Sequence, residues 1–284
     1  MCPALLLNLV AWIALGQQDS AKPRLETKTS SASSKALQDF KRDASDYVMR
    51  LENRPNDELT LRNEPLLHWG NPARYGEDGA VFVWMLDGRP EVVGSVFTFR
   101  QGNLIRRKHE YHSLAGGPLS AEYRGQRVWT PRTAGVAFQA IADAPKPDDA
   151  PRRRLSQMKT LAADFSANMV EFNGQRSELR LLPQPLLRYE PQRQAIVDGA
   201  LFAFSLGTDP EVLLLLEARG EPERAEWQFA FARFHFMELK GSYKQREVWR
   251  VEGDRGIPGL SIGSPKYQDS VYATYQVSAS PAQE

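Results

Sequence analysis

The sequence contains very little cysteine: among its 284 residues, Cys2 is the only one. A single thiol excludes an intrachain disulfide and a metal site built from several cysteines. Cys2 stands inside an apolar N-terminal segment, so removal of that segment would leave a cysteine-free mature chain without a thiolate nucleophile. The body of the protein must therefore be held together by its apolar core.

An excess of charge of one sign is also missing. The 36 Lys and Arg residues and the 35 Asp and Glu residues leave a net charge of +1, which provides no overall field for nucleic acid. No glycine-rich phosphate loop follows a strand and opens a helix. The G-x-S-x-G motif at 259–263 is not followed by a histidine, as the nucleophile elbow of a serine hydrolase requires.

Long apolar runs are absent as well. The main apolar run, Ala4–Gly16, is shorter than the roughly 20 residues of a membrane-spanning helix, and polar residues follow it. This pattern predicts a signal peptide at 1–22 and a disordered spacer at 23–34. We expect an exported protein, located in the periplasm, the envelope or the medium, with no membrane span unless the N-terminal segment stays uncleaved.

What the sequence does contain is an internal repeat. Pro65–Trp69, Asp78–Phe82 and Pro90–Val92 return as Pro185–Tyr189, Asp198–Phe202 and Pro210–Val212, each 120 residues later (185 − 65 = 120). Tyr123 and Val128-Trp129 return at the same distance as Tyr243 and Val248-Trp249. Separated blocks in one register predict a tandem duplication. We expect repeat 1 over 35–143, a Pro- and Arg-rich linker over 144–154 and repeat 2 over 155–284.

Each repeat shows a helical pattern followed by strand patterns. Apolar residues recur at steps of three and four over 37–51 and over 155–169, which predicts an amphipathic helix in each copy. Asp87–Pro90 and Gly207–Pro210 predict hairpin turns, and Val271–Val277 predicts an extra closing strand. The expected fold class is α+β, a tandem duplication in which each copy has a helix and an antiparallel sheet of about five strands. The copies would then form two domains or one pseudo-twofold body. The expected strands are 58–69, 79–86, 91–100, 108–114 and 119–129, then 178–189, 199–206, 211–219, 226–239 and 241–251.

Several stretches resemble an uncharacterised family of exported proteins from planctomycete-type bacteria. They are ELRLLPQPLLRY, DGALFAF, GTDPEVLLLLEA and WQFAFAR in the second copy, and GAVFVW, GRPE, HEYHSL and VW-x-P in the first. The resemblance covers most of the mature chain. It implies export, and it implies no known activity or functional residues.

The densest group of chemically active side chains is His109-Glu110-Tyr111-His112. On a strand, Glu110 and His112 face the same side, so this pair is the candidate for acid/base work or metal binding. A third partner must come from elsewhere, and His68 is the other histidine of this copy. Exposed polar side chains on a strand are the simpler interpretation, and we predict no catalytic residue and no bound metal or cofactor.

Large aromatic residues are the candidates for ligand binding. Curved antiparallel sheets lidded by helices can enclose an apolar cavity, and packing in the core is the competing role for such residues. The candidate lining residues are Trp84, Phe202, Phe204, Phe229 and Phe231.

The sequence thus favours a non-catalytic binding or interaction module, with an envelope protein or an apolar ligand as partner. One alternative is a periplasmic or envelope carrier of an apolar ligand. Another is a metal-dependent or acid/base hydrolase that uses Glu110 and His112.

Overall fold

The computed structural model describes residues 25–71, 77–191, 195–256, 260–264 and 268–281. The predicted signal peptide at 1–22 and residues 23–24 of the predicted spacer lie outside the described residues. The chain divides into two compact units, Met1–Lys35 and Ala36–Glu284. The described part of the first unit is the beginning of helix α1 (Leu25–Ser45), and all the strands belong to the second unit.

The protein is mostly β, because strands account for many more of the described residues than the two α-helices do. The prediction of an α+β tandem of helix-plus-sheet copies is therefore wrong. The described residues contain two α-helices, α1 and α2 (Pro151–Ala163), while the strands form three sheets, one of them a curled half-barrel. Residues 25–34 belong to α1, although the sequence predicted a disordered spacer there.

The two predicted helices end early because the residues after them form strands. The helix expected over 37–51 ends at Ser45, and Tyr47–Leu51 form strand β1. The helix expected over 155–169 ends at Ala163, and Phe165–Val170 form β10. Apolar residues at Tyr47, Met49 and Leu51 fit a period of two, and antiparallel pairing with the segment around Ala121 stabilises the strand.

The strands have the following bounds: β1 (Tyr47–Leu51), β2 (Thr60–Leu61), β3 (Leu67–Asn71), β4 (Glu77–Leu86), β5 (Arg89–Gln101), β6 (Leu104–Ser113), β7 (Leu119–Tyr123), β8 (Gln126–Trp129), β9 (Gln139–Ala140), β10 (Phe165–Val170), β11 (Arg176–Leu181), β12 (Leu187–Tyr189), β13 (Ile196–Leu206), β14 (Asp209–Arg219), β15 (Glu226–Arg233), β16 (Glu238–Tyr243), β17 (Arg246–Val251) and β18 (Tyr272–Pro281).

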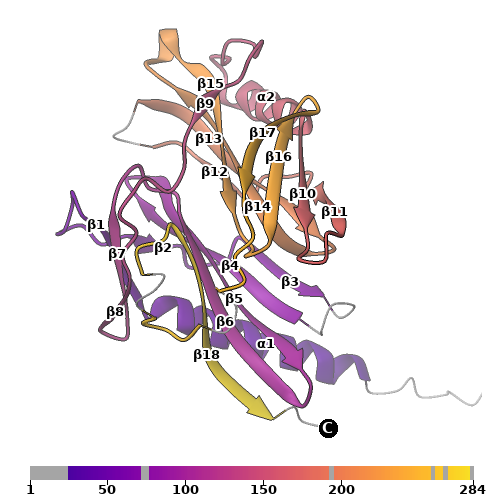
Figure 1. Cartoon of the computed structure of the whole chain (residues 1–284). Helices are drawn as coiled ribbons and strands as arrows, with labels where there is room; N and C mark the ends of the chain where they lie inside the picture. The colour runs from indigo at the N-terminus through magenta and orange to yellow at the C-terminus, as the bar shows by residue number, and fades with distance from the viewer. Residues whose placement is uncertain (1–24, 72–76, 192–194, 257–259, 265–267, 282–284) are drawn as a thin grey trace, which may run out of the picture. The chain divides into compact units, whose positions relative to one another are not determined.

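All strand pairs between named strands are antiparallel, and within the described residues they make three sheets (Figure 1). The nine-stranded sheet has the order β17-β16-β10-β11-β13-β14-β15-β9, with β12 beside β13. The six-stranded sheet has the order β18-β6-β5-β4-β2, with β3 beside β4. The third sheet is β1-β7-β8.

Matching irregularities recur 120 residues apart. The β4–β5 pair has a bulge between Trp84 and Met85, and the β13–β14 pair has one between Phe204 and Ser205 (204 − 84 = 120). The β7–β8 and β16–β17 pairs likewise have bulges at Ala121/Glu122 and Gly241/Ser242 (241 − 121 = 120). The internal repeat remains a prediction, and these bulges support it because bulges are specific features of a strand pair.

Three large apolar clusters lie among the described residues. One lies between the six-stranded and nine-stranded sheets, where Val83 and Val93 of the first meet Leu213 and Leu215 of the second. A second cluster lies on the other face of the nine-stranded sheet and includes Met158 of α2. The third joins the six-stranded sheet to β1-β7-β8 and to Phe40 of α1. The two large sheets therefore pack face to face, and each has a second apolar layer on its outer face.

The sheets exchange strands with distant parts of the chain. β18, yellow in Figure 1, lies beside β6 and extends the six-stranded sheet. This confirms the extra strand expected near Val271–Val277. In the other direction, β9 from the connection before α2 pairs with β15 of the nine-stranded sheet. The predicted linker at 144–154 overlaps α2, which begins at Pro151.

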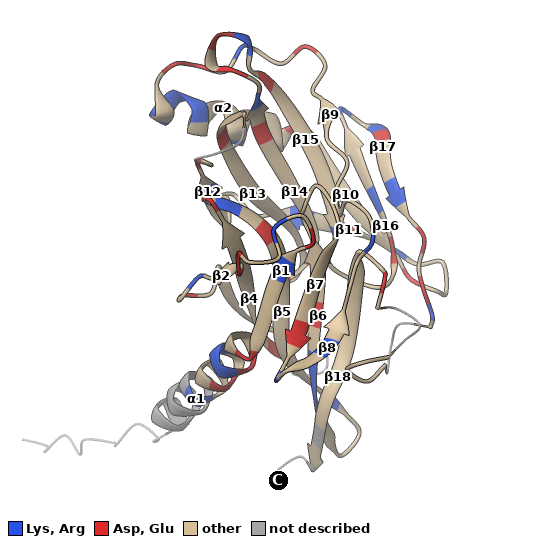
Figure 2. Cartoon of the chain, turned by 90° about the vertical axis from the view of Figure 1, so that its left-hand side faces the viewer, with Lys and Arg blue, Asp and Glu red and all other residues tan. Residues whose placement is uncertain are grey.

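The charged residues of β5 and β14 lie near the ends of these strands (Figure 2). On β14, Glu211 and Glu217 flank an uncharged run and are fully buried. On β5, Arg89 and Glu91 are buried at the start of the strand. Buried charges are costly unless they are paired, so the ends of these strands are the places where polar chemistry concentrates.

Candidate functional site

Two aromatic rings close the nine-stranded sheet on itself. Phe231 of β15 stacks on Trp249 of β17, with ring centroids 5.3 Å apart and an interplanar angle of 22°. These strands stand near opposite ends of the sheet order. We call the place where these two rings meet the seam. An equivalent contact occurs 120 residues earlier, where the rings of Tyr111 and Trp129 are 6.0 Å apart.

The contact between Tyr111 and Trp129 is covered by a long strand, whereas the seam is covered by a short one and stays partly open. Beside Tyr111, β18 pairs with β6 along its length, and the Trp129 indole donates a hydrogen bond of 2.7 Å to the Ser270 carbonyl. Beside Phe231, the covering strand is the two-residue β9, which pairs only with Gln228 and Phe229. The edge of β15 beyond Phe229 therefore borders a hollow.

That hollow is a pocket of about 370 Å³, which we call the seam pocket. The nine-stranded sheet supplies an apolar wall of Phe229, Phe231, Trp249 and Val251. Loop residues 134–137 form a second wall. The polar side chains in the lining include His112 from β6, Arg233 from the end of β15 and Tyr272 from the start of β18. This composition, apolar walls with a few placed polar groups, is typical of small-molecule sites.

His112 is uncharged at neutral pH. Its side chain is 4% exposed, and burial lowers the pKa of His112 from 6.5 to about 4. Nε2 donates a hydrogen bond of 3.0 Å to the Gly135 carbonyl, which fixes the proton on that nitrogen. Gly135 fits closely here, since a Cβ would lie 1.8 Å from the Ser113 carbonyl oxygen. His112 thus ties the loop to β6.

Arg233 is held rigidly by backbone carbonyls. Its Nε donates to the His235 oxygen at 3.0 Å, Nη1 to the Glu252 oxygen at 3.2 Å and Nη2 to the Met237 oxygen at 3.0 Å. The guanidinium lies 5.0 Å from the centre of the Tyr272 ring. Burial lowers the pKa of Arg233 below its ordinary value, although Tyr272, Asp254 and Glu110 act in the opposite direction.

Glu110 belongs to this region through Tyr272. Its Oε2 accepts a hydrogen bond of 2.9 Å from the Tyr272 hydroxyl, and the carboxylate is buried. Burial and the nearby Glu110 raise the pKa of Tyr272 well above 10. Glu110 and His112 do share one face of β6, but each has its own hydrogen-bond partner.

His68 cannot join Glu110 and His112. In the antiparallel register His68 is opposite Ala80, Ala80 opposite Val96, and Val96 opposite His109. Opposite residues point to the same face of a sheet. His68 therefore shares a face with His109, and not with Glu110 or His112. His68 instead contacts Asp78, with Nε2 2.9 Å from Oδ1. Among the described residues, no group of three potential ligands is placed to hold a metal ion.

All five predicted aromatic residues are buried, and two of them also line the pocket. Phe229 and Phe231 line the seam pocket. Phe202 and Phe204 are fully buried on the same face of the nine-stranded sheet, in its core. Trp84 is fully buried beneath α1 and β1, in the core behind the six-stranded sheet. Sequence reasoning missed Arg233, Trp249 and Tyr272. The alternation Trp227, Phe229, Phe231, Arg233 was the available signal for Arg233.

A second polar cluster joins the two large sheets. Arg89 of β5 donates from Nε to Glu217 at 3.1 Å and from Nη1 to Glu91 at 3.1 Å and to the Leu114 carbonyl at 3.0 Å. Tyr189 donates to the same Glu217 at 2.7 Å. Burial lowers the pKa of Arg89, but the charges of Glu217 and Glu91 outweigh it and raise the pKa. Arg89 borders a separate cavity of about 490 Å³, and the hydrogen bonds of its Nε and Nη1 are made within the protein.

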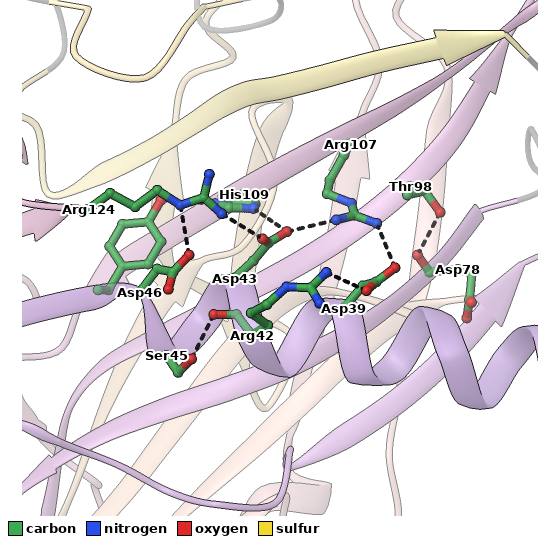
Figure 3. Close-up of polar contacts among 11 residues, drawn as sticks. Asp39, Arg42, Asp43, Ser45, Asp46, Asp78, Thr98, Arg107, His109 and Arg124 are labelled. Carbon is green, nitrogen blue, oxygen red and sulfur yellow. Dashed lines mark hydrogen bonds and ion pairs between the residues drawn. The ribbon is translucent and has the colours of Figure 1, made fainter.

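A third polar cluster attaches α1 to β6 (Figure 3). His109 lies between Tyr47, whose hydroxyl is 2.9 Å from Nδ1, and Asp43, whose Oδ2 is 3.4 Å from Nε2. Arg107 also donates to Asp43, at 3.0 Å. Burial lowers the pKa of His109, so the ring is neutral, accepts from Tyr47 and donates to Asp43. This chain of hydrogen bonds is enclosed in the core and serves to position α1.

No protein family, curated protein or solved structure matches this chain in the comparisons made with it. The resemblance to exported proteins of planctomycete-type bacteria remains a prediction. No helix among the described residues has both the length and the apolar composition needed to cross a membrane.

Proposed function

We propose that this protein is a non-catalytic binding protein that holds a small amphiphilic ligand in the seam pocket. The observation that carries the proposal is the unsealed seam: a pocket of about 370 Å³ with aromatic walls and the guanidinium of Arg233 at its polar part. The volume suits a molecule of about one aromatic ring with a short chain. The predicted export would place this pocket in the periplasm, the envelope or the medium.

A hydrolase is less well supported. The Glu110 carboxylate accepts from Tyr272, and the His112 Nε2 proton is donated to Gly135. A general base must reach the proton that it abstracts within hydrogen-bond distance or through one water. Here Glu110 is a structural partner of Tyr272 and does not line the pocket, and the low pKa of His112, about 4, makes its unprotonated Nδ1 a weak base.

The proposal is tested by measuring ligand binding to the wild type and to Trp249→Ala. Single-ring amphiphiles titrated by calorimetry should bind the wild type with a Kd of roughly 10 µM to 1 mM, the range expected for so small a ligand. Trp249→Ala removes one aromatic wall and should weaken binding about tenfold or more, because the apolar contact area is lost.

Phe99→Ala is the matched control, because Phe99 is a half-buried aromatic on β5 that does not line the pocket. It should leave the Kd unchanged. Equal losses in the two variants, or no binding of any amphiphile to the wild type, would contradict the proposal.

A further inference from the structure

We infer that the ligand of the seam pocket is a monocarboxylate whose acid group meets Arg233. This inference rests on the proposed binding function and adds the chemical class of the ligand. It follows from the position of one cation beside the aromatic wall of the pocket.

The first step is the side of the strand on which Arg233 stands. Phe229, Phe231 and Arg233 alternate along β15, so the guanidinium emerges on the face that carries the aromatic wall. Opposite Arg233 in the register is Val212, an apolar residue. A core strand with this pattern would ordinarily end in another apolar residue, and the arginine places a charge at the border of the pocket.

The second step is the number of donors that Arg233 has left. A guanidinium carries five N–H groups in a fixed fork. Three hydrogen bonds, one from each nitrogen, go to the carbonyls of His235, Glu252 and Met237. These carbonyl groups fix the orientation of the guanidinium, and because they carry no formal negative charge they do not neutralise it. The remaining donors on Nη1 and Nη2 fit a carboxylate, which takes such forks in a bidentate manner.

The third step is the charge of the surroundings. His112 is the other titratable nitrogen of the pocket and is neutral near pH 7 because its pKa is about 4. Asp254 and Glu110 act on Arg233 electrostatically, but neither lines the pocket, and Tyr272 already donates to Glu110. Arg233 is therefore the charged side chain that a bound ligand would contact, which favours an anionic group and disfavours a cationic one.

The test compares three ligands of one shape: 3-phenylpropanoate, 3-phenylpropan-1-ol and 3-phenylpropylamine. On the wild type at neutral pH, the acid should bind about 10- to 100-fold more tightly than the alcohol, the usual worth of hydrogen bonds between charged groups. The amine should bind more weakly than the alcohol. Arg233→Met should abolish the preference for the acid, whereas Arg233→Lys, which keeps the charge, should retain part of it.

The outcomes separate this inference from the binding proposal. If acid and alcohol bind the wild type equally, and Trp249→Ala weakens both, the pocket binds ligands but the carboxylate inference is wrong. If none of the three binds, the proposed function itself fails. If Arg233→Met does not fold, the comparison of the three ligands on the wild type still tests whether the pocket prefers a carboxylate.

Discussion

Buried histidines reveal how this protein avoids buried charge. His109 and His112 are both nearly inaccessible to solvent, and burial lowers the pKa of each. A neutral imidazole can donate from one nitrogen and accept at the other. His109 uses both nitrogens, toward Tyr47 and Asp43, and His112 donates to Gly135. Protonation would place a charge in each buried site, so these residues couple folding to pH.

The contribution of His112 to stability should be lost in acid. The ring has a pKa near 6.5 when unfolded and about 4 when folded, so above pH 6.5 its contribution is present in full. As the pH falls from 6.5 to 4, the unfolded chain binds a proton that the folded chain does not, and the free energy of unfolding decreases. Over that window the loss should be about 3 kcal/mol, measured by urea unfolding at a series of pH values.

His112→Gln isolates this effect, because glutamine is neutral at every pH. The variant can be less stable at pH 7, but the difference in unfolding free energy between it and the wild type should shrink as the pH falls from 6.5 to 4. His109, Glu110 and Arg233 remain present in both proteins, so their contributions cancel to first order. Parallel pH profiles for the two proteins would show that His112 does not titrate as described.

At the scale of secondary-structure elements, the hairpin turns show how the residues of a turn determine its backbone conformation. Asp87 and Gly88 both have positive φ, 48° and 83°, as a two-residue type I′ turn requires. The β7–β8 turn has the same pattern at Arg124 and Gly125, with φ of 51° and 78°. The β16–β17 turn places two non-glycine residues, Lys244 and Gln245, at φ of 46° and 67°. A left-handed conformation costs a non-glycine residue roughly 1–2 kcal/mol.

Exchanging the turn residues should therefore change stability in opposite directions. Gln245→Gly should stabilise the protein by about 1 kcal/mol, because glycine adopts the left-handed conformation without a steric penalty. Gly125→Gln, at the corresponding place in the other hairpin, should destabilise it by a similar amount. A Cβ at Gly125 would have no atom within 4 Å, so crowding does not enter. Thermal unfolding of both variants checks the pair.

Sequence patterns correctly predicted the features that depend on residues close together in the chain. The turns at Asp87–Pro90 and Gly207–Pro210 were confirmed, because glycine and aspartate at a strand exit determine the backbone locally. β1 was mistaken for the end of a helix, since Tyr47, Val48 and Leu51 fit steps of three and four as well as a strand. Only its pairing with β7, about 70 residues away in the chain (119 − 51 = 68), resolves the ambiguity.

The candidate site was predicted in part for the same reason. His112, Phe229 and Phe231 carry recognisable chemistry in the sequence, and all three line the seam pocket. Their meeting with Trp249 and Tyr272 depends on the curl of the nine-stranded sheet and on β18, which pairs Tyr272 with His112 at a separation of 160 residues (272 − 112 = 160). His68 failed as a partner because the register places it on the other face of its sheet.

At the scale of the second compact unit, the exchange of strands joins elements that are distant in sequence. β18 completes the six-stranded sheet, and β9 extends the nine-stranded one. Between the sheets, the ion pair of Arg89 with Glu217 connects β5 to β14 within the shared core. Neither large sheet can then lose its structure without exposing apolar surface of the other.

Residues 36–284 should consequently unfold in a single cooperative transition. Arg89→Met leaves Glu91 and Glu217 buried without this cation, and removal of one partner of a buried ion pair costs about 3–5 kcal/mol. Because the pair bridges the sheets, this cost should reduce amide exchange protection in β14 as well as in β5, and the calorimetric and van't Hoff enthalpies should agree. Arg132→Met is the control, since the exposed Arg132 pairs with the exposed Glu52 and Asp269 and should change stability far less. Two separate transitions, or lost protection confined to β5, would show that the two large sheets fold independently.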